Sequence, residues 1–257
     1  MKRARRPVLA LLLVGLTCRT AVAQRPFQLQ GNVTFDWLRG DRLTYSFDLE
    51  PKTLVVVPAG SPDWRNLDLT PSVEYAATNW LDLTGEFVAG YTKQTDDENS
   101  LELTPRVGVR FHLLSRDLPT IVHKDPVTGR ERLPRRRLVV RDWARVEWRN
   151  FSYSGDTPDS SKWRFGNRLE FLFPLNRANI TMDGTRYLLA DWQWMVPLGD
   201  PKERFANRQR IRTGLGYRRN FRWRFAILYM WTRSRDTTGE PLRITDSALN
   251  LRVEHFF

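Results

Sequence analysis

The end of the chain, Ile244-Thr-Asp-Ser-Ala-Leu-Asn-Leu-Arg-Val-Glu-His-Phe-Phe257, is the clearest indication of the fold, because apolar and polar side chains alternate along it. Leu249, Leu251, Val253 and Phe257 fall on one face, and Asp246, Asn250, Arg252 and Glu254 fall on the other. A period of two is typical of a β-strand that separates an apolar surface from a polar one. We therefore expect residues 244–257 to form a strand.

The same alternation recurs along most of the chain. Ten further segments carry it: 31–38, 43–50, 66–76, 80–92, 101–113, 138–151, 163–173, 186–196, 209–218 and 221–233. Turn-like or polar stretches separate them, and residues 115–136 form a long basic connection that we interpret as a loop rather than a second domain. The pattern predicts an all-β chain of about 10–12 strands.

The apolar faces of these segments carry no lysine or arginine, although the chain contains 41 of these residues. An arginine that faces lipid at the membrane midplane costs about 2–4 kcal/mol. A soluble β-sandwich also alternates, but it has no need to keep basic residues off every apolar face. The pattern therefore favours a closed, antiparallel, up-and-down transmembrane β-barrel. Asp142, Asn167 and His255 are polar exceptions on the proposed outer faces.

The first residues have the features of a secretion signal. Residues 2–6 are rich in lysine and arginine, residues 8–16 are apolar, and Ala21-Val22-Ala23 supplies the small residues that precede cleavage. We expect a signal peptide over 1–23 and one outer-membrane barrel domain over 24–257. Cleavage there removes Cys18, which is the only cysteine, so we expect neither disulfides nor thiol chemistry.

The inward positions are unevenly charged. The strands before the middle place acidic side chains inside, with no basic residue among their inward positions, whereas the later strands place mostly arginines there. The predicted acidic face comprises Asp48, Asp68, Glu74, Asp82 and Glu86. The predicted basic face comprises Arg106, Arg110, Arg145, Arg149, Arg164, Arg168, Arg210, Arg212, Arg224 and Arg252. Since the first and last strands meet when a barrel closes, an acidic arc should face a basic arc across the lumen.

Two interpretations of this interior remain open. Facing charges could pair and fill a structural barrel, because buried charges must be paired or wet. Alternatively, a narrow porin-like pore could select anionic small solutes at its arginine wall. An outer-membrane lipid-modifying enzyme of the acyl hydrolase type is the alternative function. It would need a serine beside a histidine base, and none of His112, His123 and His255 falls at the expected outer rim. We expect no catalytic, cofactor-binding or metal-binding residues, no cofactor, and no nucleic-acid partner, so we do not expect an enzyme.

Several motifs are similar to those of a family of bacterial outer-membrane β-barrels known as a domain of unknown function. They are the stretch from Trp163 to Glu170, Pro174-Leu175, the stretch from Asn207 to Arg210 and Gly214-Leu215-Gly216-Tyr217, preceded by Trp37, the stretch from Pro71 to Tyr75 and Gly90-Tyr91. The resemblance spans most of residues 24–257 and implies a barrel in the outer membrane of a Gram-negative-type bacterium. It implies no activity.

The last strand also resembles the terminal recognition strand of outer-membrane barrels. Phe257, Val253, Leu251 and Leu249 would form its assembly signal. The expected partners are outer-membrane lipid and the barrel assembly machinery that reads such a strand.

Overall fold

A computed structural model of the chain describes residues 25–58, 63–95, 97–114, 123–124, 131–132, 138–199, 207–235 and 240–257. The expected signal peptide, residues 1–23, lies outside these residues. No helix that could cross a membrane occurs in the part of the chain described. Within that part the structure is all-β, as the alternation predicts.

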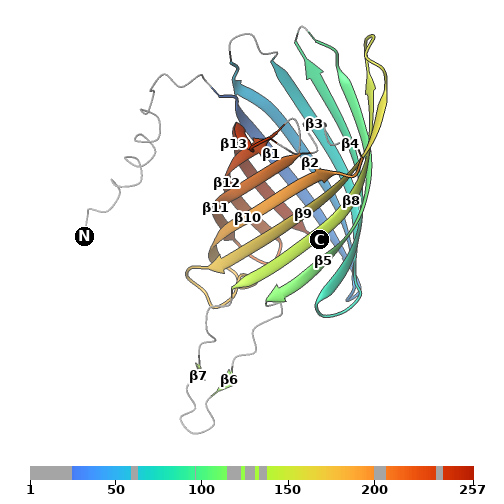
Figure 1. The fold of residues 1–257 in the computed structure, drawn as a ribbon. Coiled ribbons are helices and arrows are strands. Elements are labelled where there is room, and N and C mark those ends of the chain that lie inside the picture. The colour runs from blue at the N-terminus through green and yellow to red at the C-terminus, as the bar shows by residue number, and fades with distance from the viewer. Residues whose placement is uncertain are drawn as a thin grey trace, which may run out of the picture.

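Eleven of the described strands close into one barrel (Figure 1). They are β1 (Phe27–Arg39), β2 (Leu43–Val56), β3 (Trp64–Ala76), β4 (Leu81–Gln94), β5 (Ser100–Leu114), β8 (Val139–Tyr153), β9 (Ser160–Pro174), β10 (Thr185–Pro197), β11 (Arg208–Arg218), β12 (Trp223–Ser234) and β13 (Arg243–Phe256). Each strand pairs with its sequence neighbour, and β5 pairs with β8 across the long connection. The strand number lies within the predicted range.

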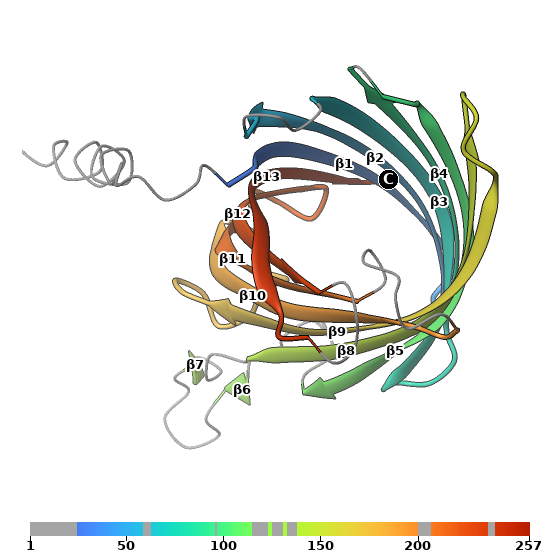
Figure 2. The same cartoon turned by 45° about the horizontal axis from the view of Figure 1, so that its top comes forward.

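The closing pair differs from a fully antiparallel barrel. β1 runs parallel to β13, with Phe27 beside Ser247 and Asp36 beside Phe256. An up-and-down sheet with an odd number of strands can close only through one parallel pair. As a consequence, the first strand begins and the last strand ends at opposite rims of the barrel (Figure 2).

The two rims carry different connections. One, which we call the long-loop rim, carries residues 57–63, 95–99, 154–159, 198–207 and 235–242. The other, the short-turn rim, carries residues 40–42, 77–80, 115–138, 175–184 and 219–222. The connection 115–138 contains a small hairpin of β6 (His123–Lys124) and β7 (Glu131–Arg132), which hangs below the barrel in Figure 1. This hairpin is a detail that the loop interpretation of the sequence did not include.

Local sequence explains why the strands turn where they do. Gly40 has a φ of 65°, a left-handed conformation that lets the chain reverse tightly between β1 and β2. At the β9–β10 connection, Gly184 has a φ of 73°, and Asn176 Nδ2 donates to the Gly184 carbonyl at 2.9 Å. This contact closes the connection on itself.

The inner face differs in composition between the two sides of the barrel. From β8 to β12, inward side chains form a buried apolar cluster: Val139, Leu172, Ile180, Tyr187, Leu189, Ala226 and Leu228. Ile180 comes from the β9–β10 connection, which folds inward at the short-turn rim. Gly216 leaves space for the Tyr187 ring, since a Cβ there would lie 2.1 Å from it. We call the inner face of β8–β12 the packed wall and the inner face of β1–β4 the open wall.

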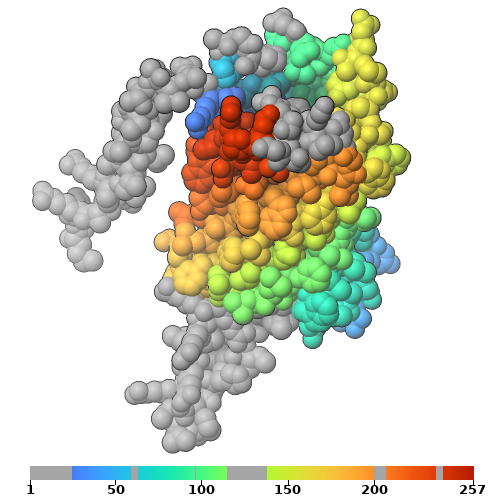
Figure 3. Space-filling view, in the orientation of Figure 1, coloured from blue at the N-terminus to red at the C-terminus, as the bar shows by residue number. Residues whose placement is uncertain are grey.

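The outer face carries the apolar band. In the space-filling view, side chains of β9 to β12 cover their side of the barrel without a gap (Figure 3). On the described strands, the outward-facing basic residues Arg39, Arg65, Lys93, Arg186 and Arg233 all lie at strand ends. Between the ends, the outward residues are mainly aliphatic or aromatic.

Candidate functional site

The candidate site is the interior of the barrel. A cavity of about 1140 Å³ occupies it. Its lining includes Pro26 and Trp64 near the long-loop rim as well as Leu38 and Phe256 near the short-turn rim. One continuous space therefore extends along most of the barrel axis.

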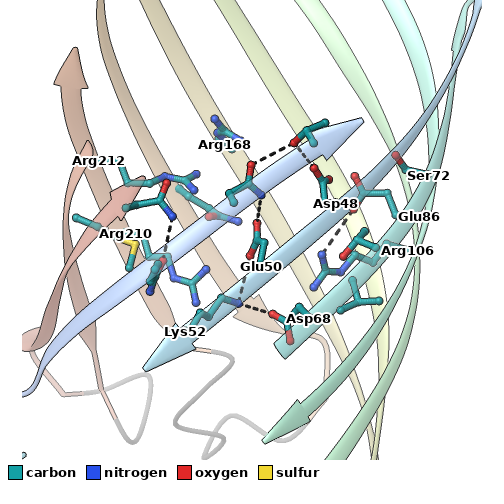
Figure 4. Close-up of a pocket in the computed structure, with 18 of the residues that line it drawn as sticks. Asp48, Glu50, Lys52, Asp68, Ser72, Glu86, Arg106, Arg168, Arg210 and Arg212 are labelled. Carbon is teal, nitrogen blue, oxygen red and sulfur yellow. Dashed lines mark hydrogen bonds and ion pairs between the residues drawn. The ribbon is translucent and has the colours of Figure 1, made fainter. Parts of the chain in front are cut away.

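The structure places the predicted interior residues as follows. All ten arginines of the predicted basic face line the cavity: Arg106, Arg110, Arg145, Arg149, Arg164, Arg168, Arg210, Arg212, Arg224 and Arg252. Four of the predicted acidic residues line it as well: Asp48, Asp68, Glu74 and Glu86. Figure 4 shows Arg210 and Arg212 on the opposite side of the view from Asp48 and Glu86.

Asp82, the fifth predicted acidic residue, is buried in the wall beside the cavity. It is 1% exposed, and His112 Nε2 forms an ion pair with its carboxylate. Lys52 corrects the expectation that the first strands carry no basic residue inside. The structure extends β2 to Val56, beyond the predicted end at residue 50, and Lys52 lines the cavity.

Glu147 on β8 is the centre of the most deeply buried ion-pair network. Its side chain is fully buried, and Arg145 Nε and Arg164 Nε donate to its two oxygens at 2.6 and 2.7 Å. Arg106 Nε approaches the same carboxylate at 3.6 Å. Removing a charge from water costs several kcal/mol, which close counter-charges and hydrogen bonds must offset. Three guanidinium groups supply that compensation here.

Asp191 on β10 anchors a second network in the packed wall. Its side chain is also fully buried, and Arg212 Nε donates to it at 2.8 Å. Arg168 Nη2 lies 3.3 Å from the other oxygen and also binds Glu170. Arginine is suited to such bridging because its planar guanidinium presents five donors.

Smaller ion pairs connect the rest of the interior. Arg149 binds Glu102 through two nitrogens, at 2.9 and 3.0 Å. Lys52 bridges Glu50, at 3.2 Å, and Asp68 on the open wall. Arg110 pairs with Glu74, and Arg224 lies 3.5 Å from Glu254. The two predicted charge arcs are therefore partly neutralised by one another.

Two carboxylates of the open wall have neutral partners instead. Ser46 Oγ donates to Asp36, and Thr34 Oγ1 donates to Asp48. No ion pair to either carboxylate occurs among the described residues. Asp36 is only 8% exposed, so its charge is both buried and uncompensated.

Aromatic side chains lie outward near both rims. At the short-turn rim Trp37 and Phe257 stack with ring centroids 5.3 Å apart, and Trp80 stacks on Phe111. At the long-loop rim Trp148 stacks on Trp163 at 5.8 Å. Amphipathic rings of this kind form girdles at the two interfaces of membrane barrels.

The predicted assembly-signal residues lie along the outer side of β13. Leu249, Leu251 and Val253 alternate with inward Asn250, Arg252 and Glu254, the last two of which line the cavity with Asn250. The Phe257 amide donates to the Asp36 carbonyl at 2.9 Å, so the end of the chain is fixed to β1.

The histidines do not form a nucleophile–base pair among the described side chains. His112 Nδ1 has no hydrogen-bond partner, and the other ring nitrogen binds Asp82. His255 packs edge-on against Trp223 and Phe257. The side chain of His123 lies outside the described residues. Within the described residues there is also no group of three or more potential metal ligands.

Comparison of the sequence with models of known protein families finds no match. Comparison with curated proteins also finds none. The site is therefore interpreted from its own geometry.

Proposed function

We propose that the chain is an exported outer-membrane barrel whose interior is a narrow passage for small anionic solutes. The cavity that reaches from one rim to the other between arginine-bearing strands is the observation that carries this proposal. Such a space in a barrel of this size suits small solutes rather than polymers.

Membrane insertion is supported by the outer face. The band between the rims, which carries no outward lysine or arginine away from the ends of the described strands, and the stacked aromatic rings at each rim match the environment of a bilayer and its interfaces. The resemblance of strand motifs such as the stretch from Trp163 to Glu170 to a family of bacterial outer-membrane barrels supports the same location.

Anion preference follows from the balance of lining charges. Basic side chains outnumber acidic ones along the cavity, and Arg210 has no ion pair among the described residues. A low-dielectric wall strengthens the field that such a charge exerts on a passing ion. Phosphorylated or carboxylated solutes would also pair with guanidinium donors.

Planar-bilayer recording of the purified barrel tests the proposal. We expect an ion current with anion preference in a KCl gradient, and Arg210→Ala should shift the reversal potential toward cation preference. Arg65→Ala is the matched control, because Arg65 lies on the outside at the end of β3. A silent bilayer would contradict the pore.

The same experiment separates the alternative enzyme. A silent bilayer together with release of fatty acid from phospholipid would favour an outer-membrane acyl hydrolase. A silent bilayer without hydrolysis would favour a structural barrel whose charges serve only one another.

Deleting Phe257 tests the proposed interaction with the assembly machinery. We expect less folded barrel in the outer membrane of producing cells, because the deletion removes the terminal aromatic and its contacts with β1. Heat-modifiable migration on gels measures the folded fraction. Assembly at the level of the full chain would contradict a recognition role for this residue.

A further inference from the structure

Five charged side chains that line the cavity lack a counter-charge at ion-pair distance among the described residues: Asp36 on β1, Asp48 on β2, Arg210 on β11, and Asp246 and Arg252 on β13. Arg210 and Asp246 lie near the long-loop rim, because both are in register with Thr232 of β12. Arg252 lies six residues further along β13, beside Asn32 of β1. Other lining charges, such as Arg168 and Glu86, take part in ion pairs.

Neutral groups hold these charges in place without neutralising them. Arg252 Nε donates to Asn250 Oδ1 at 2.8 Å, while Asp36 and Asp48 accept from Ser46 and Thr34. Arg210 Nε is buried and has no hydrogen-bond partner. A buried charge without a partner costs free energy that a correctly charged ligand would recover.

Arg252 lies at a different height along the barrel axis from the carboxylates of Asp48 and Asp36. In the register of the sheet, Arg252 lies beside Asn32, Asp48 beside Thr34, and Asp36 follows further along β1 toward the short-turn rim. Two strand spacings and two residue steps separate Arg252 from Asp48, which places their Cα atoms about 12 Å apart. Both side chains line the same cavity.

We propose that the interior binds small zwitterions, with a carboxylate or phosphate on Arg252 and an ammonium group on Asp48 and Asp36. This inference rests on the proposed passage and names the class of solute that it admits. A simple anion satisfies only the arginine and is repelled by the carboxylates. A solute that carries both charges satisfies both groups and adds no net charge to the lumen.

Calorimetric titration of the folded barrel in detergent tests the inference with three probes: 4-aminobutyrate, butyrate and butylamine. We expect 4-aminobutyrate to bind at least about tenfold more tightly than either singly charged probe, since it makes charge-assisted hydrogen bonds at both of its ends. Asp48→Asn should weaken 4-aminobutyrate about tenfold without weakening butyrate. Arg252→Gln should weaken both. Ser72→Ala is the control, because Ser72 lines the same cavity without charge.

Asp36→Asn provides a second variant should Asp48→Asn fold poorly, with the same expected selectivity. Equal affinity for butyrate and 4-aminobutyrate would overturn the inference, as would a 4-aminobutyrate affinity that neither asparagine variant changes. KCl conductance reports the passage separately. If the barrel conducts KCl but binds the three probes equally, the zwitterion site is contradicted and the passage is not. If the barrel conducts no current but binds 4-aminobutyrate more tightly than the other two probes, the passage is contradicted and the zwitterion site is not.

Discussion

The packed wall and the open wall are built from the same alternating strands, yet they treat buried charge in opposite ways. On the packed wall, fully buried Glu147 and Asp191 are each surrounded by two or more arginines, and an apolar cluster fills the adjoining space. On the open wall, Asp36 and Asp48 bind only hydroxyl groups and border the cavity. Strand periodicity therefore sets which side chains point inward, whereas their partners on the same and neighbouring strands decide where uncompensated charge remains.

The largest expected effect comes from breaking the packed wall at Glu147. Glu147→Gln should destabilise the barrel by about 3–5 kcal/mol, because it leaves buried guanidinium groups without their counter-charge. Urea-driven unfolding in lipid vesicles measures the change. Glu254→Gln is the matched control, since Glu254 is 31% exposed and lies 3.5 Å from one arginine. If Glu254→Gln lowered the free energy of unfolding as much as Glu147→Gln, burial of the ion pair would not be what makes Glu147 important.

Leucine truncations compare apolar packing in the two walls. Leu228 is fully buried in the cluster, so Leu228→Ala should cost about 2–5 kcal/mol of unfolding free energy. Leu38 lines the cavity near the short-turn rim and is 61% exposed, so Leu38→Ala should change it by no more than about 0.5 kcal/mol. The same unfolding assay measures both. Equal losses would mean that the open wall is as closely packed as the other.

The smallest effect on stability, and the clearest one on selectivity, should come from Asp48. Asp48→Asn removes a carboxylate that has no counter-charge, so the free energy of unfolding should change by less than about 1 kcal/mol. The reversal potential in a KCl gradient should shift toward anion preference. Glu86→Gln changes the lumen charge equally but disrupts pairs with Arg106 and Arg145, so it should also destabilise the barrel. Equal free energies of unfolding for Asp48→Asn and Glu86→Gln would contradict the idea that only the ion-paired carboxylate stabilises the barrel.

The alternation at Leu249, Leu251 and Val253 was enough to predict strands, inward faces and closure, because a period of two is a local property of each segment. The parallel seam was not predictable from it. The first and last strands are parallel, with Asp36 beside Phe256, only if the total number of strands is odd, and that number follows from the whole chain. Lys52 was missed because Pro51 and the run after it do not alternate clearly, although β2 continues to Val56.

Charge in the interior was predictable from the sequence, but its pairing was not. The sequence identifies Glu147 and Asp48 alike as inward carboxylates, and only the register of neighbouring strands brings three arginines to one and a threonine to the other. The inward turn of residues 175–184 escaped prediction for a similar reason. Ile180 packs against side chains that are distant in sequence, such as Leu228.

Spin labels on alternate residues of β4 in the lipid-reconstituted protein test whether its outer face meets lipid and its inner face meets water. Labels at the outward positions Leu83 and Phe87 should collide with dissolved oxygen and be shielded from a water-soluble nickel reagent. Labels at the lumen-lining positions Thr84 and Glu86 should show the reverse preference. Equal access of the nickel reagent to both sets would contradict a barrel with lipid outside and a charged, water-filled interior.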